Sequence, residues 1–95
     1  MYHVLGRVPV ADLRQFLAVF TTAGAELRRR HGARRSVVFH APGEPAHAVV
    51  LVEWESAEAF ARFRADPEAP ATMRAGGALG PPEFTPLEWA GEYSA

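Results

Sequence analysis

Five side chains of this sequence are suited to acid–base chemistry at a shared site: His3, Arg7, His40, His47 and Glu53. A neutral histidine accepts a proton near pH 7, and an adjacent carboxylate fixes its tautomer and raises its basicity. An arginine in the same cavity can hold an oxygen on which negative charge develops. The set would suit proton abstraction next to a carbonyl or from an acidic phenol. His3, Glu53 and Arg7 are the catalytic candidates.

Alternating apolar residues predict the strands that carry these side chains. Strands are expected over 2–8, 34–41 and 47–54, and 83–89 can form a last strand in which Pro86 requires an edge position or a bulge. A two-residue turn at Gly43-Glu44 would place His40 opposite His47 and Arg34 opposite Glu53. In that register Val37, Phe39, Val50 and Trp54 face the helices, and all five candidates share the other face.

Structural roles compete with chemistry at each candidate. Glu53 can form an ion pair with Arg34 across the hairpin. His40 and His47 can be exposed residues near a turn or two metal ligands, but no third ligand has a recognisable spacing, so no metal site is predicted. His3 can be an interfacial histidine and Arg7 a rim charge.

Helix signals separate the strands. Asp12 can cap a helix that runs to the basic segment 28–31 before Gly32, and Ser56 can cap a second helix that continues, after Asp66-Pro67, over 68–75. Phenylalanines at helical spacing mark its buried face. The order β-α-β-β-α-β predicts one ferredoxin-like α+β domain over residues 1–95, with a four-stranded antiparallel sheet, helices on one face and a loose tail at 91–95.

The sheet face away from the helices is too apolar to face water. A strand that is apolar on both faces must be covered twice, so a second copy of the chain is expected to cover this face. Two such sheets would enclose a barrel-like cavity as a homodimer. Trp89 can be a dimer contact or a cavity wall, whereas Trp54 is expected in the core. The expected ligand-binding residues are His40, His47, Leu5, Val38, Val49, Leu51 and Trp89.

Composition excludes several classes of function. The net charge of −1 gives no electrostatic reason to expect nucleic acid or an acidic membrane surface. The absence of Cys excludes disulfides, thiolate nucleophiles and Cys-ligated metals. No signal peptide is recognisable, and no apolar run approaches the ~20 residues needed to span a bilayer. A bacterial-type cytoplasmic location is expected.

The segments 49–60, 73–76 and 80–84 resemble dimeric α/β-barrel proteins, in particular antibiotic biosynthesis monooxygenases and small proteins labelled cyclases. Tyr2-His3-Val4-Leu5 is also similar to the first strand of stress-responsive barrel proteins, and His3 matches the cavity histidine of barrel cyclases. The chain has no Asn, which monooxygenases of this superfamily commonly use with a Trp, and residues 56–75 contain neither Trp nor His.

The resemblance implies an enzyme without metal, haem or flavin that acts on an aromatic or polyketide-like ligand. A non-catalytic ligand carrier or stress-related dimer is the alternative.

Overall fold

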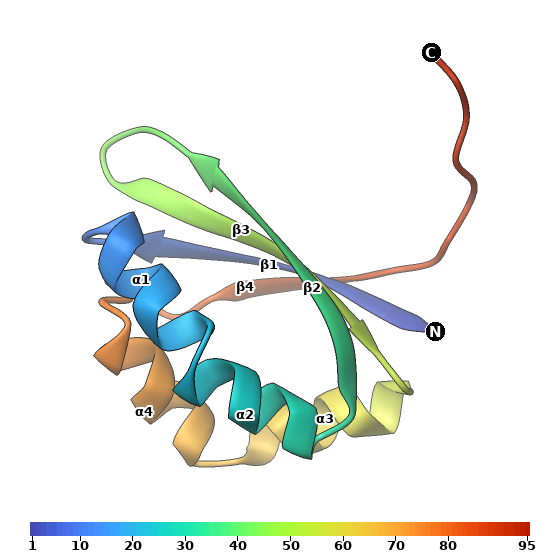
Figure 1. Ribbon diagram of the computed structural model, residues 1–95, viewed down its shortest axis with the longest axis horizontal. Helices are drawn as coiled ribbons and strands as arrows, with labels where there is room; N and C mark the ends of the chain where they lie inside the picture. The colour runs from blue at the N-terminus through green and yellow to red at the C-terminus, as the bar shows by residue number, and fades with distance from the viewer.

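The computed structural model describes residues Met1–Ala95 as a four-stranded sheet covered on one face by four helices (Figure 1). The elements are β1 (Tyr2–Val10), α1 (Leu13–Phe20), α2 (Ala23–Arg30), β2 (Ala33–Ala41), β3 (Ala46–Trp54), α3 (Ala57–Ala65), α4 (Glu68–Ala75) and β4 (Glu83–Leu87). The strand order is β2-β3-β1-β4 and every neighbouring pair is antiparallel. The predicted ferredoxin-like α+β fold is confirmed.

Two predicted helix starts are confirmed by hydrogen bonds. The Asp12 carboxylate accepts from the Arg14 backbone N–H at 2.9 Å, and the Ser56 hydroxyl accepts from the Ala59 N–H at 3.1 Å. Each bond satisfies a backbone donor that has no partner within the helix. These caps fix where the chain turns from strand to helix.

The helix predicted to run from residue 13 to the basic segment is instead divided at Thr21 and Thr22. The Thr21 hydroxyl donates to the Leu17 carbonyl at 2.7 Å, and the Thr22 hydroxyl donates to the Ala18 carbonyl at 2.6 Å. Such bonds compete with the helical ladder and bend helices. Thr22 has φ −120° and ψ −96°, outside the helical region, so α2 starts in a new direction. The prediction of one continuous helix was wrong here.

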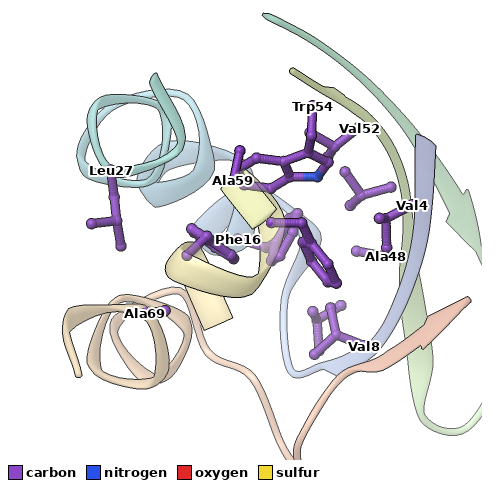
Figure 2. Packing of buried hydrophobic residues seen from close by; sticks show 13 residues of the cluster. Val4, Val8, Phe16, Leu27, Ala48, Val52, Trp54, Ala59 and Ala69 are labelled. Atoms are coloured by element: carbon purple, nitrogen blue, oxygen red, sulfur yellow. The ribbon is translucent and has the colours of Figure 1, made fainter. Parts of the chain in front are cut away.

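The core lies between the sheet and the helices (Figure 2). Even-numbered residues of β1 and β3 point into it, and Trp54 is only 1% exposed. Its ring centroid lies 4.9 Å from that of Phe63 and 5.5 Å from that of Phe60, both on α3. The predicted core role of Trp54 is therefore confirmed.

The register of the β2–β3 hairpin differs by one residue from the predicted one. Ala41 pairs with His47, not with Ala46, so Val38 lies opposite Val50 and packs against the core. Because side chains alternate across a strand, a one-residue shift exchanges its faces. Val37 and Phe39 therefore share the face away from the helices.

A bulge at Arg34 ends this shifted register. Arg35 pairs with Glu53, whereas Ala33 pairs with Trp54, so Arg34 has no partner in the ladder. Its guanidinium donates to the Glu55 carboxylate at 3.0 Å. The expected ion pair between Arg34 and Glu53 was wrong.

The C-terminal strand pairs only with β1, at the edge position that Pro86 requires. It ends at Leu87, two residues earlier than predicted, and the following residues have no regular secondary structure and extend away from the sheet (Figure 1). None of the four helices combines the length and apolar character that a membrane crossing requires.

Candidate functional site

A pocket of about 230 Å³ lies on the sheet face away from the helices, which we call the open face. We call it the His3 pocket. All four strands contribute to it, β4 through its last residue Leu87, together with residues 88–90 that follow β4. Its lining residues are His3, Arg35, Val37, Leu51, Glu53, Leu87, Glu88, Trp89 and Ala90.

His3 and Glu53 meet in this pocket because they are paired across β1 and β3. The imidazole Nε2 lies 3.3 Å from the Glu53 Oε1, and the two side chains are 13% and 29% exposed. The His3 Nδ1 is buried and has no hydrogen-bond partner. The sequence placed both residues on one face, and the register brings them into contact.

The charge state of Glu53 determines which nitrogen of His3 is free. An ionised carboxylate only accepts hydrogen bonds, so a neutral His3 donates from Nε2 and keeps its lone pair on Nδ1. A lone pair without a partner in a largely buried site is a proton acceptor. After proton uptake, the adjacent Glu53 would stabilise the imidazolium.

Aromatic and aliphatic side chains surround this pair. The Trp89 ring centroid lies 6.4 Å from that of His3, and Trp89 is 68% exposed. Leu51 and Leu87 complete the apolar wall. An exposed indole beside a proton acceptor suits a flat aromatic ligand.

Other predicted site residues lie outside the pocket. Arg7 is exposed and lies opposite Val49 on β3 and Glu83 on β4. Leu5 and Val49 lie on the open face beyond the lining residues, and His47 pairs with Pro9 at the hairpin end of the sheet.

The changed register moves two expected cavity residues to the other face. Val38 packs against the core, and His40, opposite Ala48, is exposed on the helix-facing side. The placement of Val38 and His40 in the sheet cavity was therefore wrong. The hairpin connection is one residue longer than the two-residue turn on which that placement depended.

The sequence did not indicate five lining residues: Arg35, Val37, Leu87, Glu88 and Ala90. Arg35 and Val37 reach the open face through the register shift, and Arg35 lies opposite Glu53. Leu87 lies there because it pairs with His3, and Glu88 and Ala90 follow the end of β4. Only Val37 could have been considered as a pocket residue from the sequence, since an apolar side chain at that position fits either face of the sheet.

A second, smaller space lies within the core. It measures about 90 Å³ and is lined mainly by apolar side chains, with Trp54, Thr72 and Arg28 as its polar members. The Trp54 Nε1 is buried without a partner. An engineered apolar cavity of about 150 Å³ is the size that holds benzene, so this inner pocket is too small for an aromatic ligand.

Arg28 closes one side of the inner pocket. Its guanidinium carbon lies 3.5 Å from the Phe20 ring centroid, and Nη2 donates to the Phe20 carbonyl at 2.9 Å. Burial, and to a lesser extent the charge of Arg29, lowers the pKa of Arg28 to about 10. The guanidinium is still charged at pH 7, and its role in the structure is to cover the aromatic core.

No group of three or more His, Asp and Glu side chains in the chain is arranged to hold a metal ion. The two histidines considered as metal ligands lie on opposite faces of the sheet. His40 pairs with Ala48 and His47 pairs with Ala41.

The sheet order, with helices on one face and a polar pair on the other, defines a ferredoxin-like α+β protein with a pocket on its open sheet face. Residues 1–75 match the family model for antibiotic biosynthesis monooxygenases, and the chain belongs to that family. No curated protein matches the sequence.

Solved structures share the fold at low sequence identity. A cofactor-independent oxygenase, SnoaB from Streptomyces nogalater, is 19% identical with a TM-score of 0.73, over 96% of this chain and 94% of that one. The ActVA-Orf6 monooxygenase of Streptomyces coelicolor, solved with nanaomycin D, is 21% identical with a TM-score of 0.68, over 99% and 91%.

A dimeric ferredoxin-like protein from an uncultured marine organism is 8% identical with a TM-score of 0.63, over the full length of both chains. At these levels of sequence identity the comparisons show a similarity of fold.

Proposed function

We propose that this chain is a cofactor-independent enzyme that acts on a small aromatic or polyketide-like ligand in the His3 pocket. The observation that carries the proposal is the contact between His3 and Glu53, which leaves the buried Nδ1 of His3 without a partner. Trp89 supplies an aromatic surface beside it. Membership of the antibiotic biosynthesis monooxygenase family supports the same class of reaction.

In this proposal, His3 Nδ1 removes a proton from an acidic phenol or from a carbon next to a carbonyl. Before the proton transfer Glu53 fixes the tautomer of His3, and after the transfer it stabilises the imidazolium. Access to Nδ1 requires a shift of the imidazole or of the segment at 88–90, which has no regular secondary structure. The substrate anion can then react with dioxygen or close a ring.

Arginines would stabilise the resulting anion. Arg35 lines the pocket and is the cation nearest in register to Glu53. Arg7 lies further along β1 and would hold only the distal end of a longer ligand. A guanidinium can donate two parallel hydrogen bonds to a developing oxyanion.

A second copy of the chain would cover the pocket and complete the assembly. The open face carries Leu5, Val49 and Leu51 in a half-buried state, and Phe39 is 60% exposed. Burial of such a face removes apolar surface from water. The dimeric relative with the same fold supports this arrangement.

Oxygenation of an anthrone to an anthraquinone tests the activity. One dioxygen is consumed and one water is released for each quinone formed, so oxygen uptake and quinone absorbance must agree. His3→Ala and Glu53→Gln are expected to lower kcat by about 10²-fold or more, the usual contribution of a general base. Glu58→Gln, on the exposed side of α3, is the matched control. Unchanged turnover in both His3→Ala and Glu53→Gln would overturn the proposal.

Ligand binding without catalysis is the second candidate. The exposed Trp89 indole supports it, because an aromatic ligand can stack there whether or not His3 accepts a proton. In that case the anthrone binds with no oxygen uptake, and Trp89→Ala weakens binding while His3→Ala has little effect.

A further inference from the structure

The inner pocket of about 90 Å³ lies between the sheet and the helices and shares no residue with the His3 pocket. Three strands and all four helices contribute to its walls. Contacts between aromatic rings hold these walls together. The Phe60 ring centroid lies 5.2 Å from that of Phe84, and the Phe16 centroid lies 5.3 Å from that of Phe20. The pocket therefore has preformed walls, which lowers the entropic cost of binding.

One polar group in these walls has no partner. Trp54 lines the pocket and is 1% exposed, and its indole Nε1 is buried and forms no hydrogen bond. Figure 2 shows this indole among the buried side chains of the core. A buried donor without an acceptor costs free energy relative to a donor that is bonded to water. An acceptor atom inside the pocket would therefore stabilise the structure.

Water is a poor occupant of this space. A buried water typically forms ~3 hydrogen bonds, and it needs at least two polar partners. Arg28 and Thr72 are the other polar side chains of the wall. The Arg28 Nη2 already donates to the Phe20 carbonyl at 2.9 Å, and the Arg28 guanidinium carbon lies 3.5 Å from the Phe20 ring centroid. An occupant that needs only one hydrogen bond therefore fits these walls better than water does.

The volume limits the size of the occupant. An apolar cavity of ~150 Å³ holds benzene, so a space of about 90 Å³ holds, in proportion, a molecule of ~4 non-hydrogen atoms. Because most of the lining side chains are apolar, the occupant has to be neutral and largely hydrocarbon. A short-chain ketone or aldehyde meets these conditions and carries one acceptor oxygen.

We propose that the inner pocket binds a small neutral carbonyl compound, whose oxygen accepts a hydrogen bond from the Trp54 Nε1–H and whose alkyl groups contact the apolar wall. A site with an unpaired buried donor discriminates against an analogue that cannot accept a hydrogen bond from it. This binding site lies on the helix-covered side of the sheet and is independent of the proposed reaction at His3.

The test compares acetone with isobutene, which has the same shape but no acceptor. Each is titrated into the full-length protein and followed by NMR of the indole N–H and methyl signals. The chain has two tryptophans, and the Trp89→Phe variant identifies the indole signal of Trp54. Acetone is expected to shift this signal downfield together with the methyl signals of Val50 and Leu27, whereas isobutene should shift the methyl signals alone.

Variants separate the donor from the cavity. Trp54→Phe should lower the ratio of acetone affinity to isobutene affinity about fivefold, the effect of losing one hydrogen bond. Ala69→Leu, which fills the pocket from α4, should weaken both ligands at least tenfold, while Ala61→Leu at an exposed position of α3 outside the pocket should bind them as the wild type does.

Three results would each overturn the proposal. The first is a Trp54 indole signal that acetone does not move. The second is an unchanged affinity ratio in Trp54→Phe. The third is a long-lived water on the Trp54 Nε1–H that acetone does not displace.

Discussion

The imidazole Nε2 of His31 lies 2.8 Å from the Oδ2 of Asp66, and this contact joins the end of α2 to the junction of α3 and α4. Both side chains are largely buried, at 17% and 16% exposure. The Asp66 carboxylate also accepts from the Glu68 N–H at 2.9 Å. The two distant parts of the helical layer are therefore connected by one carboxylate.

Acid should weaken this connection. The hydrogen bond from His31, followed by that from the Glu68 backbone, lowers the pKa of Asp66 below its usual value of 3.8, with a further contribution from Arg30. A carboxyl group whose pKa is lower in the folded state adds stability above its unfolded pKa and loses it as pH falls through the folded pKa. Removal of the carboxylate should therefore lower the free energy of unfolding most at neutral pH.

Asp66→Asn tests this by urea unfolding between pH 2 and pH 7. The variant should unfold at lower urea than the wild type at neutral pH, and the two midpoints should converge as the pH falls through the folded-state pKa of Asp66, which lies below 3.8. Arg30 and Glu68 form their own ion pair at 2.6 Å beside the site and are present in both proteins. Glu92→Gln in the C-terminal segment serves as the control, and a pH-independent difference would contradict the assignment.

Loss of the Ser56 cap should destabilise the fold by about 1 kcal/mol, the usual cost when an N-cap serine is replaced by alanine. The reason is that the Ala59 N–H loses its acceptor at 3.1 Å. Ser56→Ala and Ser94→Ala, a serine in the exposed C-terminal segment, form a matched pair for chemical denaturation. Equal midpoints for the two variants would show that the cap contributes nothing.

Phe63→Ala should cost about 3–5 kcal/mol of unfolding free energy, the range for removal of a buried phenylalanine ring. Phe63 is 8% exposed, packs against Trp54 in a tilted arrangement and has an edge contact with His31 at 6.3 Å between ring centroids. Guanidinium unfolding followed by far-ultraviolet circular dichroism measures the loss. A cost below about 1 kcal/mol would contradict the packing described for α3.

Phe39→Glu should reduce self-association and leave the unfolding free energy of the single chain nearly unchanged. Phe39 is 60% exposed on the open face, so a charge there affects a second copy more than the core. Sedimentation velocity over a concentration series measures the effect. The exposed change Glu58→Arg on α3, on the other side of the molecule, should leave association as in the wild type.

The sequence was sufficient to predict the order of the strands and the two helix caps, because these depend on local periodicity and on single side chains such as Asp12 and Ser56. Trp54 was assigned to the core by parity alone. The division at Thr21 and Thr22 was missed because threonine at these positions is compatible with a helix until its hydroxyl bonds to the preceding turn.

The candidate site was predictable only in part. The shared face of His3 and Glu53 follows from alternation, but their contact depends on the register in which β1 pairs with β3, which the sequence analysis did not predict. Val37 was expected on the helix-facing side and Arg35 was given no role, because the length of the hairpin connection sets the register and a two-residue turn was assumed. The position of Leu87 depends on its pairing with His3, and that of Ala90 on where β4 ends.

Residues 35–41 of β2 lie between the bulge at Arg34 and the connection at Pro42–Pro45. In this stretch each side chain lies on the face opposite to the one it would have in a hairpin with a two-residue turn. The bulge returns β2 to its original phase at Ala33, which pairs with Trp54, so the exchange ends before β2 reaches Trp54. Loop length can therefore change the side chains that β2 offers to a ligand or a second copy, and the same change replaces Val38 on the side that packs against the core. Deletion of one loop residue would replace Val37 and Phe39 on the open face by Val38 and His40, and relatives with different loops can carry different pocket walls on the same scaffold.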